Sequence, residues 1–177
     1  MSSNLKLRLP PARATSLKQV LALKNPPAGG LGWHGLIESG LPSDSLYTVA
    51  KAIGVADKYL ANFLEVDLEG LKDKGTLGRV ASDLLFAVAR AYTRAATRLG
   101  TEQAGLWLVT PQPALGDRAP IDALRTRVGT EYVSGLINQM GQRQTLPQEE
   151  RKARAASVPA LTNAGNVALG PSAAGGV

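Results

Sequence analysis

The sequence has no cysteine and a single histidine, His34, among its 177 residues. Disulfide bridges and cysteine-based zinc sites are therefore excluded. No apolar run approaches the roughly 18 to 20 residues that a membrane-spanning helix needs. These absences favour a cytoplasmic protein that does not span a membrane and that carries no metal or other cofactor.

Aromatic residues are scarce, and the positive charge is unevenly placed. They make up 5% of the sequence, whereas 44% is hydrophobic, so Ala, Leu and Val must build most of the core. Within the net charge of +6, residues 1–28 contain five bases and no acid, whereas residues 29–140 contain eleven bases and twelve acids. The charge therefore lies in the terminal segments and does not by itself indicate a DNA-binding core.

No group of residues has a pattern typical of catalysis. His34 has no cysteine or acidic partner that would complete a metal site or a catalytic triad. Residues 29–32 are rich in Gly but lack the Lys-Ser/Thr that ends a phosphate-binding loop. The acids Glu65 and Asp67 fall at a predicted turn and helix start, where capping explains them. We therefore expect a binding protein and not an enzyme, with no catalytic or metal-ligating residues.

Helical spacing of hydrophobic residues from Trp33 onwards predicts an all-α protein, a small helical bundle. Three short helices are expected over residues 45–53, 56–64 and 68–74, with Gly54 ending the first and Asp67 capping the third. The second and third helices, with the turn between them, have the outline of a helix-turn-helix unit.

Four further helices are predicted in the second half of the chain, each beginning at a residue that favours a helix N-terminus. They are a helix over residues 82–99 capped by Ser82, one over 102–109 capped by Thr101, one over 121–128 started by Pro120 and one over 131–140 capped by Thr130.

Both ends of the chain differ from its middle. Residues 1–32 are expected to form a basic, flexible arm, in which alternation over residues 5–9 indicates a short strand-like stretch. A helix-turn-helix domain over residues 33–79 and a second helical domain over residues 80–141 follow. Residues 142–177 are expected to form a tail with a short helix after Pro147, and the rest of the tail to order only on a partner.

The helix-turn-helix unit has two interpretations, which both stay open. In the first, it contacts phosphates or base edges of DNA. The residues that would do so are Lys58, Asn62, Lys72, Lys74 and Arg79. In the second, it is a packing or dimerisation unit, because carboxylates on the same stretch are repelled by phosphate. These carboxylates belong to Glu65, Asp67, Glu69 and Asp73.

A row of arginines lies on the longest predicted helix. Arg90, Arg94 and Arg98 are spaced four residues apart and therefore share one face. A solvated helix face is the commoner explanation of such a row. Contact with phosphate or with an acidic partner is the alternative.

The most informative motifs stand between residues 104 and 141. They read A-x-x-W-L, then P-x-x-A-L-G, then P-hydrophobic-D-x-L-x-T, then G-x-x-x-V before a closing amphipathic helix. The residues that carry them are Ala104, Trp107, Leu108, Pro111, Ala114, Leu115, Gly116, Pro120, Ile121, Asp122, Leu124, Thr126, Gly129, Val133 and Leu136. With these motifs the chain resembles the Xre-type antitoxins of RES–Xre toxin–antitoxin systems, over about residues 35–141.

The helix-turn-helix half of this resemblance departs from the family pattern. Gly40-Leu41-Pro42 and the helix that ends at Gly54 are similar to it. The family usually has Gly where Glu65 stands, Thr where Gly70 stands and a basic residue where Asp73 stands. The departures bear on direct DNA reading more than on the fold.

The resemblance implies a homodimeric, non-enzymatic antitoxin that binds a RES-domain toxin, an enzyme that degrades NAD. Residues 80–141 would be the toxin-binding domain, which covers the toxin cleft, and the complex would repress its own operon. The contact residues so implied are Trp107, Leu115, Pro120, Thr126, Gly129, Val133, Leu136, Met140, Arg143, Arg151 and Arg154. The alternatives are a stand-alone helix-turn-helix repressor that binds operator DNA, and a helical scaffold whose basic arms bind nucleic acid without sequence preference.

Overall fold

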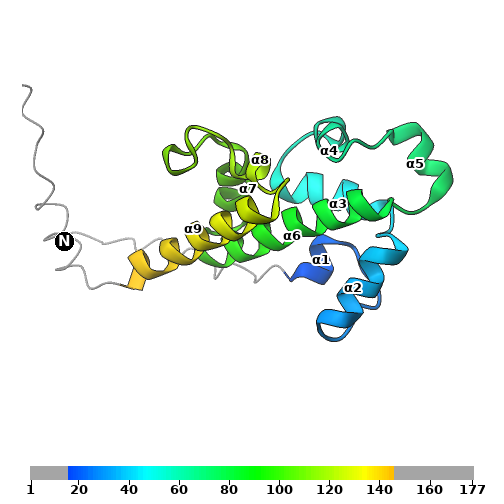
Figure 1. Cartoon of the computed structure of the whole chain (residues 1–177), viewed down its shortest axis with the longest axis horizontal. Coiled ribbons are helices and arrows are strands. Elements are labelled where there is room, and N and C mark those ends of the chain that lie inside the picture. Colours follow the sequence, from blue (N-terminus) through cyan, green and yellow to red (C-terminus); the bar gives the residue numbers. More distant parts are fainter. Residues whose placement is uncertain (1–15, 146–177) are drawn as a thin grey trace, which may run out of the picture. The chain divides into compact units, whose positions relative to one another are not determined.

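The computed structural model describes residues 16–145, with side chains as far as residue 140, and every regular element in this range is helical (Figure 1). The prediction of an all-α protein is confirmed for these residues. Contacts group residues 1–142 into one unit and residues 143–177 into another, and the packing described below belongs to the first. The predicted strand-like stretch over residues 5–9 and the helix after Pro147 lie outside the described residues.

Nine α-helices and one short 3-10 helix follow one another in the described range. In chain order they are α1 Leu17–Val20, α2 Gly29–Ser39, α3 Asp44–Ile53, α4 Asp57–Leu64, α5 Leu68–Lys74, α6 Arg79–Leu99, α7 Thr101–Val109, η1 Pro113–Leu115, α8 Pro120–Ala123 and α9 Arg127–Thr145. The three short helices predicted over residues 45–74 are therefore confirmed as α3, α4 and α5.

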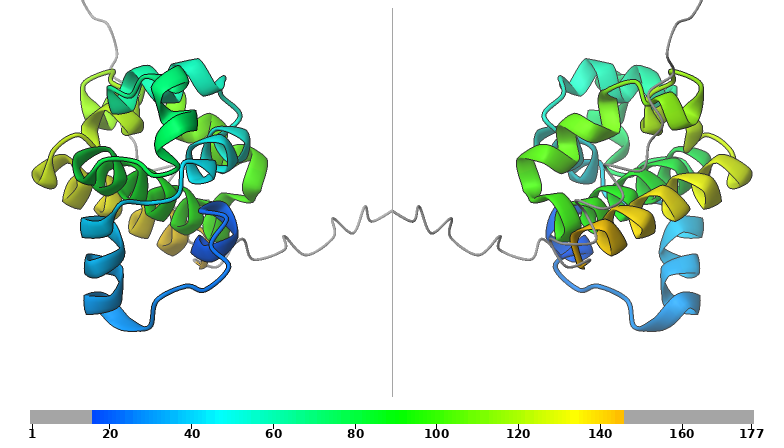
Figure 2. Two further views of the ribbon diagram at one scale, coloured as in Figure 1. Left: turned by 90° about the vertical axis from the view of Figure 1, so that its right-hand side faces the viewer. Right: turned by 90° about the vertical axis from the view of Figure 1, so that its left-hand side faces the viewer.

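Helix α6 lies at the centre of the first unit and packs against α1, α2, α3, α4 and α7 (Figures 1 and 2). Leu85, Val88, Tyr92 and Ala95 recur at intervals of three and four residues along it and are all buried. This spacing places them on one side of the helix, where they form the middle of the core. Helix α6 begins at residue 79 and packs against helices from both predicted domains. The domain boundary predicted between residues 79 and 80 therefore stays a prediction.

Helix α7 crosses the end of α3 at very close range. A Cβ placed on Gly105 would lie 2.6 Å from the carbonyl oxygen of Ile53, which is closer than such atoms approach. Its neighbours Ala104 and Leu108 are fully buried. Glycine at this position lets the backbones of α3 and α7 meet, and this contact fixes the position of α7.

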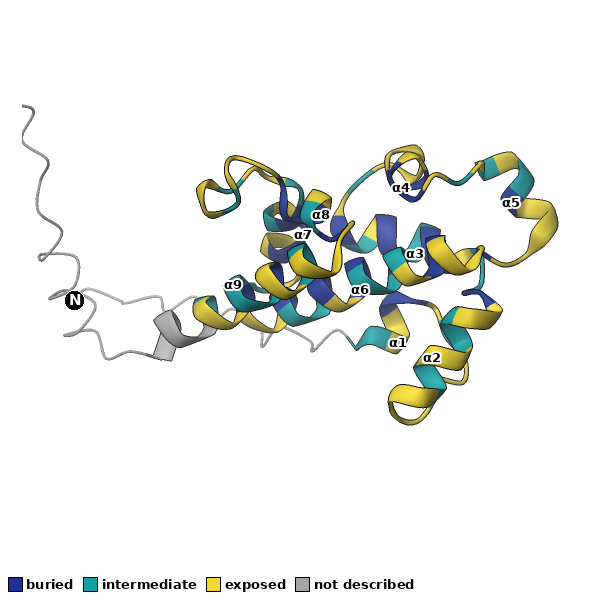
Figure 3. Cartoon of the chain, viewed as in Figure 1, coloured by how far each residue is buried: buried dark blue, intermediate teal, exposed yellow. Residues whose placement is uncertain are grey.

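Residues 17–21 belong to the core and not to a flexible arm. Val20 and Leu21 are buried, and the buried hydroxyl of Ser45 donates a 2.6 Å hydrogen bond to the carbonyl of Leu21. Helix α2 begins at Gly29 and not at Trp33, and none of its residues is fully buried (Figure 3). It is held to α6 by the Trp33 ring, whose centroid lies 5.1 Å from that of Phe86.

The predicted cap at Ser82 is wrong, because α6 begins earlier, at Arg79. Ser82 is fully buried in the first turns of this helix. Its hydroxyl accepts a 2.9 Å hydrogen bond from the backbone N–H of Leu41, a partner far away in the sequence. The residue therefore joins the connection between α2 and α3 to the central helix.

Two other predicted caps are also wrong. Thr101 is the first residue of α7 and the N-cap position is Gly100. Thr126 and not Thr130 caps α9, because its hydroxyl accepts a 3.0 Å hydrogen bond from the N–H of Gly129. Helix α8 is correspondingly a single turn that ends at Ala123, where the chain bends towards α9. The predicted caps at Asp67 and Gly54 are confirmed.

Candidate functional site

The loop between α7 and α8 is held in place on two sides. The N–H of Gln112 donates to the carbonyl of Arg118 at 3.0 Å, which closes the loop at its base. The hydroxyl of Tyr132, on α9, donates to the carbonyl of Ala114 at 3.1 Å. Leu115 of η1 is half-buried against the core. The proline-rich segment is therefore a fixed part of the surface.

A close backbone contact sets the corner between α8 and α9. A Cβ on Gly129 would collide with the carbonyl oxygen of Ala123. Pro120 and Ile121, at the start of α8, are fully buried and anchor this turn to the core. The Thr126 cap and the glycine together define the direction in which α9 leaves the corner.

Helix α9 rests on the core along one edge and is tied to α6 on a flank. Val133 and Ile137 are 0% and 1% exposed and form its inner edge. Beside them, the guanidinium of Arg94 donates to the side-chain oxygen of Asn138 at 2.9 Å. The helix therefore keeps a defined rotation about its own axis.

The structure separates the predicted toxin-contact residues into two groups. Pro120 and Val133 are fully buried, so they stabilise the packing of α8 and α9 and cannot contact a partner directly. Gly129 is likewise needed for the corner itself. The remaining described positions reach the surface, with Thr126 exposed and the others half-buried. These others are Trp107, Leu115, Leu136 and Met140. The Arg143 side chain, Arg151 and Arg154 lie outside the described range.

Three exposed apolar residues of the same region are not among the contacts that the sequence predicts. Leu106 is 59% exposed, Val128 is 77% exposed and Tyr132 is 53% exposed. Val128 and Tyr132 are four residues apart on α9 and therefore share a face. Their spacing is visible in the sequence, but the predicted helix boundaries place Val128 in the preceding helix.

Helices α4 and α5, with the turn between them, occupy the residues for which a helix-turn-helix unit is predicted. Lys58, Asn62, Lys72 and Lys74 are exposed on it, as DNA contact requires. The side chain of Arg79 is also exposed, and it is paired with Glu38 at 3.1 Å. The structure also exposes the four carboxylates of this stretch, of which Asp67 accepts from two N–H groups at the start of α5.

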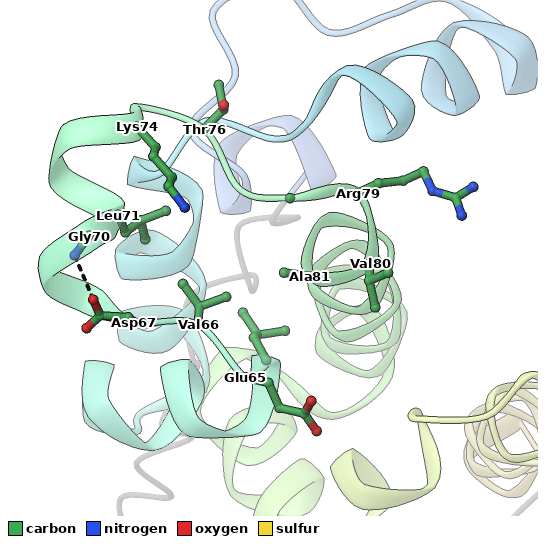
Figure 4. A pocket seen from close by; sticks show the side chains of 12 residues that line it. Glu65, Val66, Asp67, Gly70, Leu71, Lys74, Thr76, Arg79, Val80 and Ala81 are labelled. Carbon is green, nitrogen blue, oxygen red and sulfur yellow. Dashed lines mark hydrogen bonds between the residues drawn. The ribbon is translucent and has the colours of Figure 1, made fainter.

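A pocket of about 450 Å³ lies between this turn and the start of α6 (Figure 4). Leu64, Val66, Leu71 and Ala81 supply apolar walls, and Lys74 lies at its rim. The Arg79 side chain points away from it in Figure 4. Glu65 and Asp67 also line the pocket, so its lining carries charges of both signs.

Arg125 connects the two candidate surfaces. Its guanidinium carbon lies 4.4 Å from the centre of the Phe63 ring, on α4, and it also donates to Glu65 at 3.4 Å. Tyr59 lies in the same group: burial, with a smaller contribution from the Asp122 carboxylate, raises the pKa of its phenol, and Arg125 partly offsets this. The turn after α4 is therefore in direct contact with the α8–α9 corner.

Residues 16–145 contain neither a grouped set of metal ligands nor a membrane-spanning helix. In that part of the chain, no three His, Asp or Glu side chains are placed together as metal ligands. No helix of the same part is long and apolar enough to cross a membrane.

Residues 94–142 match the family model of the antitoxin Xre/MbcA/ParS C-terminal toxin-binding domain. The matched range runs from the end of α6 through α7, η1 and α8 into α9, which is the region whose geometry is given above. This part of the chain is thus similar to the toxin-binding domains of the antitoxin class. The match supports an Xre-type antitoxin, with a toxin as its partner. No curated protein matches the chain.

Proposed function

We propose that this protein is an antitoxin that neutralises a RES-domain, NAD-degrading toxin by covering its active-site cleft. The observation that carries the proposal is the toxin-binding domain match at residues 94–142, which includes α7, the loop after it and the α8–α9 corner. A binding surface that is already ordered loses little conformational entropy when a partner docks. The protein would act in the cytoplasm, as a homodimer formed through its helical domains.

The proposed contacts are the surface residues of this corner, with a contribution from the segment that follows. They are Trp107, Leu115, Thr126, Leu136, Met140, Arg143, Arg151 and Arg154. Pro120, Gly129 and Val133 act indirectly, because they hold the corner in shape.

The experiment is an enzymatic assay of the protein encoded beside this chain. The purified neighbour is expected to consume NAD, and stoichiometric addition of the full chain is expected to stop it. Leu136→Asp should weaken this inhibition, whereas Tyr47→Phe, a change on α3, should leave it intact. NAD consumption that continues at saturating antitoxin would refute neutralisation.

Repression of its own operon is the second part of the proposal, and a stand-alone repressor is the alternative function. The α4–α5 arrangement and its exposed Lys72 and Lys74 favour DNA contact, whereas the exposed carboxylates oppose it. Fluorescence anisotropy with promoter DNA and with a scrambled duplex separates the cases. Sequence-specific binding by the chain alone, lost in Lys72→Ala and Lys74→Ala, would favour the alternative. Specific binding only with toxin present would favour repression by the complex.

A further inference from the structure

The outward surface of α9 combines two exposed apolar side chains with a glycine inside the helix. Val128, Tyr132, Gly135 and Gln139 follow one another at intervals of four, three and four residues, so they lie on one face of the helix. We call these four residues the outer face of α9. It is the side opposite to the buried edge formed by Val133 and Ile137.

Gly135 is the residue of this face that the fold does not explain. A Cβ placed there would meet no atom from elsewhere in the chain within 4 Å. Glycine inside a helix costs about 1 kcal/mol relative to alanine. Gly105 and Gly129 have tight backbone contacts that require glycine, but nothing in the described chain requires it at Gly135. Gly35 on α2 is open in the same way, so an open glycine alone does not mark an interface. Gly135 differs because it lies in the matched region beside exposed apolar residues, where close approach of another molecule would explain it.

The residues around Gly135 fit a protein partner. Val128 is 77% exposed and Tyr132 is 53% exposed, so the face offers apolar area on one side of the glycine. Tyr132 is already fixed by its hydrogen bond to Ala114. A fixed aromatic side chain is a favourable interface residue, because little rotamer entropy is lost on binding.

The charges on the flank towards α6 indicate the chemistry of that partner. Arg94 contacts α9 through Asn138, and Arg90 and Arg98 extend the same row on α6. Among the described side chains, none of the ion pairs includes any of these three arginines. Arg90 also lines a groove of about 510 Å³ between α6 and the start of α9, together with Arg127 and Glu131. With Arg125 of the same groove, five arginines lie along this flank against two acids, Asp83 and Glu131.

We propose that the outer face of α9 is the surface on which the toxin packs, with toxin backbone or small side chains against Gly135 and acidic toxin side chains over the arginine row of α6. The inference rests on the proposed antitoxin function and names its docking surface. A second copy of this chain fits less well, because it would bring its own excess of arginine to the same flank.

The test uses the full chain and the purified product of the neighbouring gene, with the dissociation constant measured by calorimetry. Gly135→Leu is expected to weaken binding by about tenfold or more, which corresponds to about 1.4 kcal/mol. Gly35→Leu is the matched control, because Gly35 also lies within a helix and a Cβ added there would likewise meet nothing within 4 Å. It is expected to bind as the wild type does.

The arginine row is tested by a second set of variants. Arg90→Glu with Arg98→Glu should weaken binding by about tenfold or more, and increasingly so at low salt. Lys18→Glu with Lys51→Glu makes the same change of charge at exposed positions of α1 and α3 and should have little effect.

Each result bears on a separate claim. Tight wild-type binding that is unchanged in Gly135→Leu would overturn the outer face while leaving the antitoxin function standing. Absence of wild-type binding would count against the proposed function itself. If Gly135→Leu instead separates a homodimer in sedimentation and leaves toxin affinity unchanged, the face belongs to a second copy and the inference is wrong.

Discussion

The guanidinium of Arg125 lies over the ring of Phe63, 4.4 Å from its centre. The first residue follows α8 in the matched region, and the second is buried on α4 of the predicted helix-turn-helix unit. Glu65, in the turn after α4, accepts a hydrogen bond from the same guanidinium. One side chain therefore ties together two regions that the sequence pattern treats as separate domains.

Removal of this contact should lower stability modestly. Arg125→Ala loses a cation–π contact and a solvent-exposed ion pair, so we expect the free energy of unfolding to fall by about 0.5–1 kcal/mol. Urea unfolding followed by circular dichroism measures it. Arg118→Ala, an exposed arginine of the preceding loop, is the control. Equal effects of the two changes would show that the Phe63 contact contributes nothing.

Glu65 holds a backbone conformation that favours glycine. Its φ is 58°, in the left-handed region. Glu65→Gly relieves this strain but removes the partner of Arg125, so the two effects oppose each other in the wild type. In an Arg125→Ala background only the relief remains, and we expect Glu65→Gly to raise the free energy of unfolding by about 0.5–1 kcal/mol. A loss of stability in that background would contradict the strain.

The helices of this fold could be predicted well, but their ends and their contacts could not. Periodicity placed α3, α4 and α5 because their apolar residues repeat at helical spacing. The residue type of Ser82 favours a cap position, yet this serine is a buried link to Leu41. Local propensity carries no information about a hydrogen-bond partner that lies 41 residues away.

The buried link at Ser82 gives a second stability prediction. Ser82→Ala leaves the N–H of Leu41 without its acceptor, and an unsatisfied buried donor costs about 1–3 kcal/mol. Ser39→Ala removes an exposed hydroxyl that donates to Leu36 and should cost much less. Thermal unfolding of both variants compares them. A cost for Ser82→Ala no larger than that for Ser39→Ala would mean that water or a shifted side chain replaces the bond.

Two glycines of α9 should respond to alanine in opposite directions. Gly129→Ala pushes a methyl group into the carbonyl of Ala123 and should lower the melting temperature. Gly135→Ala meets open space and should raise the free energy of unfolding by about 0.5–1 kcal/mol through helix propensity. Differential scanning calorimetry of the free chain measures both. A destabilised Gly135→Ala would show that the free chain itself requires this glycine.

The position of the candidate site along the chain could be predicted from the sequence, but which of its residues are exposed could not. The motifs around Trp107 and Gly129 located the region that the family model matches. They did not distinguish buried Val133 from exposed Tyr132, because both are apolar residues of one amphipathic helix. Which side of such a helix faces the core depends on the rotation set by Gly129 and by the bond between Arg94 and Asn138.

Stability should fall in strongly alkaline solution. Partial burial raises the pKa of Tyr59, and full burial raises the pKa of Tyr92, above the usual value of 10.0. The folded state then keeps these protons longer than the unfolded chain, so their contribution is fully present below pH 10.0 and is lost as the pH rises through the folded pKa values. Tyr59→Phe and Tyr92→Phe should flatten this decline in urea unfolding series. An unchanged slope would show that neither phenol is shielded.

The most direct measurement is the growth of cells that express the neighbouring gene, with and without the full chain. We expect arrest when the neighbour is expressed alone, recovery when this protein is co-expressed, and loss of recovery in Gly135→Leu but not in Gly35→Leu. Continued arrest in the presence of abundant, folded wild-type protein would contradict the assignment of residues 94–142 to toxin neutralisation.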